Sequence, residues 1–139
     1  MDEYKVIKQA PSAHDFIELR KAVKWEVSNE NDCKKGLENS TFIVNISCGN
    51  NCIACGRILG DNSLVFIIQD IMVHPDHQGK GLGKKIMSAL MTYVEQYAAD
   101  RAFIGLFSAS DLEGWYEHFG FVKRPNDFLG CGMSFIHKK

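Results

Sequence analysis

A glycine-rich run is the segment of this chain best suited to bind a ligand: Gln78-Gly79-Lys80-Gly81-Leu82-Gly83. An apolar strand is predicted before it, over residues 64–73, and an amphipathic helix after it, over residues 81–98. Glycine lets the backbone approach a bound group closely. The first turn of a helix attracts anions through its unpaired N–H groups and partial positive charge. The arrangement predicts a pyrophosphate site, with positive charge from Lys80, Lys84 and Lys85.

The spacing of the glycines narrows the kind of phosphate ligand. A P-loop would need Gly-Lys-Ser/Thr at its end, and a dinucleotide fingerprint would need Gly-x-Gly-x-x-Gly after the first strand. Neither is present. The residues match Gln/Arg-x-x-Gly-x-Gly/Ala after a strand that ends in Val-x-Pro, here Val73-His74-Pro75. This closely resembles the acetyl-CoA-binding motif of the GNAT superfamily of N-acetyltransferases. The alternative is a glycine-rich turn that binds no ligand.

A second segment is similar to the same family. Trp115-Tyr116-Glu117-His118-Phe119-Gly120-Phe121 resembles its Phe-Tyr-Glu-Lys-x-Gly-Phe segment. The resemblance implies that Tyr116 protonates the departing CoA thiolate; a phenol is a suitable donor to a thiol group whose free pKa is about 8.5. The alternative is that Tyr116 only packs against the cofactor. Asp111 stands where relatives often have an asparagine that contacts pantetheine, and it could instead only cap the following helix.

The predicted strand over residues 64–73 supplies the remaining candidates for contact with acetyl-CoA. In the family, backbone amides of the corresponding strand bind the acetyl carbonyl and pantetheine. That strand is splayed from the next parallel strand at a bulge, so that the pantetheine fits between the two. By position this role falls on Ile71, Met72 and Val73. The full set of residues expected to bind the co-substrate is Ile71, Met72, Val73, Gln78, Gly79, Lys80, Gly81, Leu82, Gly83, Lys84, Asp111 and Tyr116.

Polar residues interrupt this otherwise apolar strand and mark a candidate acceptor site. Burying Gln69 and Asp70 in a strand is costly unless they have partners. Asp70 is therefore a candidate base or amine ligand, and its alternative is a structural carboxylate bonded to a neighbouring strand or to Arg57. Arg57 could line the acceptor pocket and hold a carboxylate or phosphate, and Trp25 could form its other wall. Three histidines, His74, His77 and His118, are weaker candidates for the base.

The elements that must position these residues follow from hydrophobic periodicity. Strands are predicted over residues 4–8, 41–47, 53–59, 64–73, 102–107 and 130–136. Helices are predicted from residue 12 or 13 to about 27, over 32–37, over 81–98, and from Asp111 to Phe119. The stretch 28–35 is expected to be mobile. Because a helix separates residues 64–73 from 102–107, these two strands should be parallel.

Together these elements predict an α+β fold with a three-layer α/β arrangement. Its sheet is mixed and mostly antiparallel, with one splayed parallel pair and flanking helices, as in the GNAT fold. At 139 residues the chain is expected to form a single domain over residues 1–139.

Composition narrows the partners and location. A net charge of −1 argues against non-specific nucleic-acid binding. No apolar run is long enough to span a bilayer, and the first residues do not resemble a signal peptide, so a cytoplasmic protein with no membrane partner is expected. Five scattered cysteines do not form a disulfide framework. Zinc or redox chemistry at Cys52-x-x-Cys55 is a minor alternative, and no metal is implied.

The function predicted from these observations is direct, acetyl-CoA-dependent N-acetylation of a primary amine, with catalytic roles for Tyr116 and Asp70. A small-molecule acceptor is expected because the chain is short and has no acidic patch for a basic protein tail. The alternatives are peptide or protein N-acetylation, transfer of another acyl chain, and a non-catalytic acyl-CoA sensor. A homodimer through the last strand is a further expectation.

Overall fold

The centre of the fold is a five-stranded mixed sheet with the strand order β1-β2-β3-β4-β5. The computed structural model describes residues 3–139. The strands are β1 (Tyr4–Ile7), β2 (Phe42–Cys48), β3 (Asn51–Gly60), β4 (Val65–Val73) and β5 (Phe103–Leu106). The first four pair antiparallel in sequence order, and β4 and β5 form the parallel pair. The predicted mixed, mostly antiparallel sheet is confirmed.

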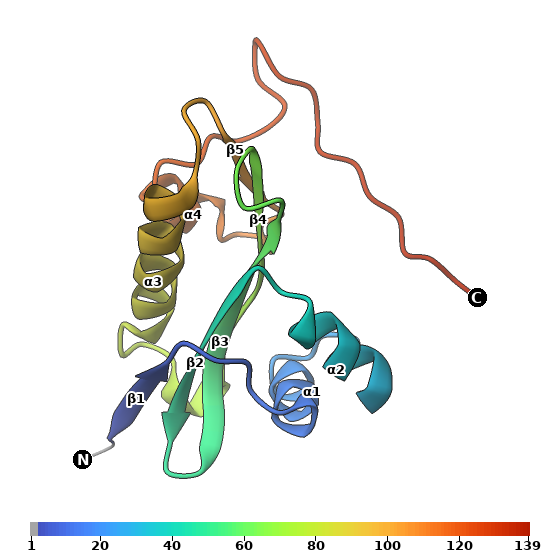
Figure 1. Cartoon of the computed structure of the whole chain (residues 1–139), viewed down its shortest axis with the longest axis vertical. Helices are drawn as coiled ribbons and strands as arrows, with labels where there is room; N and C mark the ends of the chain where they lie inside the picture. The colour runs from blue at the N-terminus through green and yellow to red at the C-terminus, as the bar shows by residue number, and fades with distance from the viewer. Residues whose placement is uncertain (1–2) are drawn as a thin grey trace. The chain divides into compact units, whose positions relative to one another are not determined.

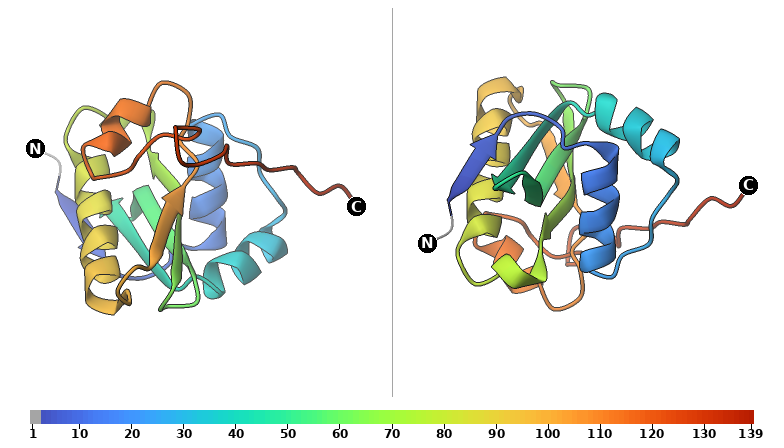
Figure 2. Two further views of the ribbon diagram at one scale, coloured as in Figure 1. Left: turned by 90° about the horizontal axis from the view of Figure 1, so that it is seen from above. Right: turned by 90° about the horizontal axis from the view of Figure 1, so that it is seen from below.

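Helices cover both faces of this sheet (Figures 1 and 2). Helices α1 (Ala13–Ala22) and α2 (Glu30–Glu38) lie on one face, and α3 (Leu82–Tyr97) lies on the other. Helix α3 packs closely on the sheet at Gly56 of β3: a Cβ atom built there would lie 2.5 Å from Ile86 Cγ2 and 3.2 Å from Leu90 Cδ1. The α1/α2 face has its own apolar cluster, formed by Phe16, Leu19, Cys33, Leu37, Cys55 and Met72.

Side-chain caps explain where the two N-terminal helices begin. Ser12 Oγ accepts a hydrogen bond from the Asp15 amide at 3.0 Å, and Asn29 Oδ1 accepts one from the Asp32 amide at 2.8 Å. The second cap starts a helix inside the stretch 28–35, so the expectation of a mobile segment there was wrong. The first helix ends at Ala22, before the predicted Val27, because Lys24 adopts a φ of 65°.

The turns around β3 follow the expected chemistry. Gly49 takes a φ of 63° between β2 and β3. Between β3 and β4, Asp61 Oδ1 accepts hydrogen bonds from the amides of Ser63, Leu64 and Val65 at 2.7–3.0 Å. These backbone donors lower the pKa of Asp61 because they stabilise its charged form. The buried residues of α3 are Leu82, Ile86, Met87, Leu90 and Val94, whose spacing places them on one face of the helix.

The chain divides into two units, one that ends at Ile104 and a second over Gly105–Lys139. The single-domain assignment therefore stays a prediction. The second unit contains one short helix, α4 (Glu113–Glu117).

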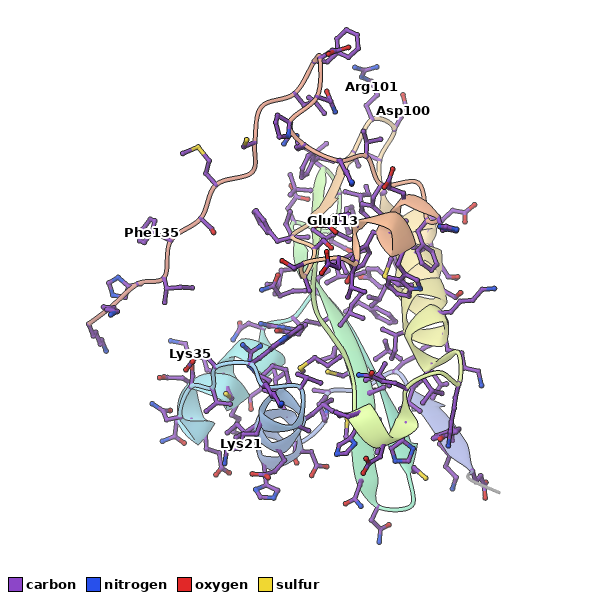
Figure 3. All side chains as sticks on the ribbon, turned by 180° about the vertical axis from the view of Figure 1, so that it is seen from behind. Lys21, Lys35, Asp100, Arg101, Glu113 and Phe135 are labelled. Atoms are coloured by element: carbon purple, nitrogen blue, oxygen red, sulfur yellow. The ribbon has the colours of Figure 1, made fainter. Side chains whose placement is uncertain are left out.

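The last strand predicted over residues 130–136 is absent from this second unit. Its alternating apolar residues have no strand to pair with, and Met133, Phe135 and Ile136 are 86–89% exposed. Figure 3 shows the Phe135 ring on this extended segment. Among residues 3–139, no helix has both the length and the apolar character that a bilayer crossing requires.

Candidate functional site

The glycine-rich loop links β4 and the short 3-10 helix η1 (Pro75–His77) to α3. Gly79 and Gly81 adopt φ values of 78° and 77°, in the left-handed region that glycine enters at no steric cost. Their missing Cβ atoms would meet nothing within 4 Å. Gln78 fixes the start of the loop, because its Nε2 donates to the Val73 carbonyl at 3.0 Å. The loop is thus a defined cradle with an open backbone.

The N-terminus of α3 offers unpaired donors to this cradle. Gly81 is the N-cap residue and has no side chain to accept from the first turn, which contains no acidic residue. The first helical hydrogen bond to the cap runs from the Lys85 amide to the Gly81 carbonyl, at 3.2 Å. Within the described chain, the amides of Leu82, Gly83 and Lys84 have no helical acceptor. Helix α3 is 16 residues long, and its first turn contains Lys84 and Lys85. The start of such a helix can bind a polyphosphate.

Tyr4 of β1 borders the same loop. Its hydroxyl lies 2.9 Å from His77 Nδ1, and the Lys80 ammonium lies 5.8 Å from the centroid of its ring. His74 lies beside them, with its ring nitrogen 3.8 Å from an Asp76 oxygen. His77 in η1 and His74 immediately before it therefore both contact neighbouring side chains at the loop.

A β-bulge divides β4 just before the residues expected to bind the acetyl group. Cys55 pairs with Met72 and Arg57 pairs with Gln69, so Asp70 and Ile71 together lie opposite the single residue Gly56. Asp70 adopts a φ of 57°, which is uncommon for a residue other than glycine. The extra residue shifts the alternation of side chains. As a result Met72 faces the α1/α2 cluster, and Ile71 faces α3.

The Asp70 carboxylate is clamped between two arginines. Arg20 Nη1, from α1, donates to Oδ1 at 2.7 Å, and Arg57 Nε, from β3, donates to Oδ2 at 2.7 Å. Only 6% of the Asp70 side chain is exposed, so these are largely desolvated, charge-assisted bonds. The alternative in which Asp70 bonds Arg57 is confirmed, and the clamp leaves neither oxygen without a cation.

Each arginine is anchored further. Arg57 Nη1 donates to the Gly36 carbonyl of α2 at 3.0 Å and lies 3.3 Å from Ser40 Oγ. Arg20 Nε donates to the Glu26 carbonyl at 2.7 Å. We call Arg20, Asp70 and Arg57 the ionic triad; it joins α1, α2, β3 and β4.

Trp25 lies beside the ionic triad. The Arg20 guanidinium carbon is 5.4 Å from the Trp25 ring centroid and 5.7 Å from that of Phe16. Trp25 remains 37% exposed, so one part of its ring is open to a ligand. Gln69, the strand partner of Arg57, is exposed. The structure thus brings four predicted acceptor-site residues together: Trp25, Arg57, Gln69 and Asp70.

Arg20 is the residue that sequence reasoning missed. It lies one turn after Phe16 on the predicted apolar stripe of the first helix, where a basic side chain needs a partner. A basic residue at that position is the sequence signal from which a buried ion pair could have been predicted. Its acid partner is 50 residues away in the sequence and cannot be identified from local spacing.

The second unit contains Asp111 and Tyr116, which were predicted to contact acetyl-CoA. Within it the Tyr116 ring contacts Trp115 and Phe121 edge-on, at centroid distances of 4.9 and 6.3 Å. Burial raises the pKa of Tyr116, so its hydroxyl stays protonated at neutral pH. Asp111 does not cap α4: the N-cap is Leu112, and Asp111 has a φ of 70°. The helix-cap alternative for Asp111 was therefore wrong.

A cavity of about 610 Å³ lies elsewhere in the first unit, between α1, the start of β3 and η1. It is lined by two of the weaker base candidates, His74 and His77, and by Cys52, but by none of the residues predicted to bind acetyl-CoA or the acceptor. The rest of its polar lining comes from His14, Asp15, Glu18, Lys21, Asn51 and Asp76.

The two cysteines of the Cys52-x-x-Cys55 motif lie in β3. Burial raises the pKa of Cys52 to about 11 and that of Cys55 well above its ordinary value, so neither is a ready thiolate. Over residues 3–139, no three His, Cys, Asp or Glu side chains are grouped as a metal site.

Comparison with known proteins agrees with this geometry. A family model described as the acetyltransferase (GNAT) domain matches residues 38–123. The uncharacterized N-acetyltransferase ycf52 of Porphyra purpurea is 30% identical over 121 residues, which cover 84% of this chain and 68% of the relative. GCN5-related N-acetyltransferase 1, chloroplastic, of Arabidopsis thaliana is 34% identical over 87 residues, or 63% of this chain and 42% of that protein.

The fold has a close structural counterpart. A crystal structure from Staphylococcus aureus, described as a protein of unknown function and probable acetyltransferase, superposes with a TM-score of 0.90. The two chains are 28% identical, and the match covers 97% of this chain and all of the other.

Proposed function

Because the chain belongs to the GNAT acetyltransferase family, we propose that it transfers the acetyl group of acetyl-CoA directly to a primary amine of a small molecule. The observation that carries this proposal is the N-terminus of α3. Three backbone amides without helical acceptors follow two glycines in the left-handed region, beside Lys84 and Lys85. This is a binding site for a polyphosphate.

The residues of the cradle would hold the co-substrate as follows. Backbone amides from Gln78 to Lys84 bind the pyrophosphate, and Lys80 and Lys84 supply positive charge. Acetyl-CoA, when bound, supplies an activated thioester. Beyond the bulge, the backbone of residues 71–73 donates to the acetyl carbonyl and to pantetheine, which polarises the carbonyl carbon for attack. Asp111 remains a candidate contact for pantetheine.

Tyr116 is proposed as the general acid. As the neutral amine nitrogen forms its bond to the acetyl carbon, the carbon–sulfur bond breaks, and the Tyr116 hydroxyl would give its proton to the sulfur. The nitrogen then releases one proton to solvent, and Tyr116 regains one from solvent. Burial raises the pKa of Tyr116, so the hydroxyl is protonated across the neutral range, as a general acid must be before the step. The amine must arrive neutral or lose a proton, since a free alkyl ammonium has a pKa of about 10.

Asp70 is assigned a positioning role in place of the predicted role as base. Both carboxylate oxygens are bound by guanidinium groups at 2.7 Å, so a proton would have to displace an arginine. Its negative charge instead orients Arg20 and Arg57 beside the reacting strand.

The first test is release of the CoA thiol from acetyl-CoA against a panel of amines: polyamines, amino sugars, amino acids, arylalkylamines and lysine peptides. Release that depends on one acceptor class supports the proposal. Lysine peptides as the only acceptors would favour the protein N-acetylation alternative. Binding of acetyl-CoA without release for any amine would favour the non-catalytic sensor. A cytoplasmic location stays a prediction, and fractionation of the source cells tests it.

Replacement of Tyr116 with Phe tests the acid. We expect turnover to fall about 100-fold, the lower end of the usual contribution of a general acid, with unchanged affinity for acetyl-CoA. Steady-state kinetics with calorimetric binding of CoA would measure both quantities. A matched control is Phe121→Tyr, which leaves the Tyr116 hydroxyl in place. Unchanged turnover in Tyr116→Phe would contradict the role.

A further inference from the structure

The ionic triad carries a net positive charge at the edge of the proposed acceptor site. Two guanidinium groups bind one carboxylate, so one positive charge is left uncompensated. In the part of the chain that the structure describes, neither arginine forms an ion pair with a second acid. The side chains of Arg20 and Arg57 are only 22% and 16% exposed, so water compensates this charge poorly.

Each guanidinium also keeps an unused donor. Arg20 bonds through Nε and Nη1, and so does Arg57. Across residues 3–139 the Nη2 atom of each has no hydrogen-bond partner in the protein, and neither is a fully buried unsatisfied atom. Both Nη2 groups therefore reach solvent. An anion at the triad would gain charge-assisted hydrogen bonds without displacing any contact now made.

The fixed geometry of the triad favours binding over a merely structural role. Arg57 is tied to α2 through Gly36, and Arg20 is packed between the rings of Phe16 and Trp25. Such guanidinium groups lose little freedom when a ligand binds. The triad adjoins the proposed acetyl site by sequence, since Asp70 immediately precedes Ile71 on β4.

We propose that the acceptor amine carries an anionic group, a carboxylate or a phosphate, which binds the unused guanidinium edges of Arg20 and Arg57 on the α1/α2 face of β4. This inference rests on the proposed function. The half-exposed Trp25 ring would cover the carbon chain between the two ends of the acceptor. Acceptors with a second positive charge, such as polyamines, are repelled by the triad.

The experiment compares matched pairs of amines that differ only in the anion. One arm uses ω-amino acids of two to six carbons and their carboxamides; the other uses aminoalkyl phosphates and the corresponding amino alcohols. We expect at least one acid to have a kcat/KM more than tenfold above that of its neutral partner. The arm in which this occurs identifies the anion as carboxylate or phosphate.

Two conservative variants link the preference to the triad. Arg20→Lys and Arg57→Lys keep a positive charge for Asp70 but lose the planar guanidinium and its Nη2 donor. Each is expected to raise the KM of the acid about ten- to hundredfold while the KM of the neutral partner changes little. Lys21→Met is the matched control, because it removes an exposed cation from the next position of α1 (Figure 3). The Lys21 ammonium lies 3.3 Å from a Glu18 carboxylate oxygen and makes no contact with the triad among the described residues. Thermal unfolding and CoA binding would verify that each variant is folded.

Opposite results overturn the inference. Neutral amines acetylated as well as their acids, or an acid preference that survives both arginine variants, would refute the anion site while leaving the acetyltransferase intact. If no amine is acetylated, calorimetric titration of the CoA-saturated protein with the acids would show whether the anion site exists. Binding that both variants weaken supports the anion site although the proposed function fails, and absence of binding refutes both.

Discussion

The bulge in β4 and the glycine loop after it both contain backbone in the left-handed region, but they reach it by opposite means. In the loop, Gly79 and Gly81 adopt φ values near 78° with no Cβ and no neighbouring side chain within 4 Å of its place. In the bulge, Asp70 adopts a φ of 57° while two arginines from α1 and β3 hold its carboxylate. The loop conformation is intrinsic to its residue type, whereas the bulge conformation is imposed by tertiary contacts.

This difference separates a binding site that folds locally from one that depends on assembly. A glycine in the left-handed region costs nothing, so the cradle needs no external support. A non-glycine residue in that region costs of order 1–3 kcal/mol and persists only when its surroundings hold it. The triad provides that hold. We therefore expect mutations at the bulge to lower the stability of the whole first unit. Mutations in the loop should mainly lower the affinity for the ligand.

The largest effect is expected from Asp70→Ala. This change leaves two mostly buried guanidinium groups without their anion, which costs about 3–5 kcal/mol of unfolding free energy. Asp70→Asn should cost less, because asparagine tolerates the left-handed region and still accepts a hydrogen bond. Urea denaturation measures both.

The control for this pair is Asp76→Ala, which removes an acid with 83% of its side chain exposed and should change stability by less than about 0.5 kcal/mol. A cost below 1 kcal/mol for Asp70→Ala would mean that the triad does not hold the bulge.

An intermediate effect is expected from Gly81→Ala. The new Cβ meets no atom, so the cost comes from the φ of 77° alone, about 1–2 kcal/mol. Relief of this strain would distort the first turn of α3, and the affinity for acetyl-CoA should fall at least tenfold. Calorimetric titration with CoA measures the affinity. Gly130→Ala, at a position with ordinary φ and open space, is the comparison. Equal affinities in the two variants would show that the cradle does not depend on this conformation.

The smallest effect is an alkaline loss of stability at the bulge. The Cys55 thiol donates to the Asp70 carbonyl at 3.4 Å, and burial raises its pKa well above the ordinary value of 9.0. Cys52 is raised to about 11. Below pH 9 both thiols are protonated in the folded and unfolded chain. Above it only the unfolded chain releases these protons, so each thiol should lower the free energy of unfolding by about 1 kcal/mol per pH unit from pH 9 toward pH 11.

Urea denaturation at pH 8, 9 and 10 would measure this slope. Cys55→Ala should roughly halve the slope, because only Cys52 then contributes, whereas removal of the exposed Cys131 by the same substitution should leave it unchanged. A slope that Cys55→Ala leaves unchanged would assign the alkaline loss to other groups.

The contrast between loop and bulge also explains what could be predicted from the sequence. The loop, the long strand and α3 were predicted correctly because glycines and period-3.6 apolar residues act locally. The polar pair Gln69-Asp70 was identified as anomalous, and its partner Arg57 was named. The bulge was expected only from the family resemblance. Arg20 was not predicted, because its role depends on a contact across 50 residues.

Two further errors have the same physical cause. Residues 130–136 have strand-like alternation, but a strand requires a neighbour whose position the alternation does not encode. The stretch 28–35 is polar, yet Cys33 and Leu37 on one face of α2 join the apolar cluster and hold the helix in place. In both cases the outcome is decided by what the segment packs against.

The triad also sets an order of events during synthesis. Arg20 leaves the ribosome 50 residues before the acid that neutralises it, and Arg57 leaves 13 residues before. Contacts between distant residues form only after the intervening chain is available, so α1 can acquire its ionic anchor only once β4 has been made. Until then α1 has only its apolar side to hold it. The acceptor side of this protein should therefore become rigid only after the chain has passed the bulge, although α1 is among the first elements to be made.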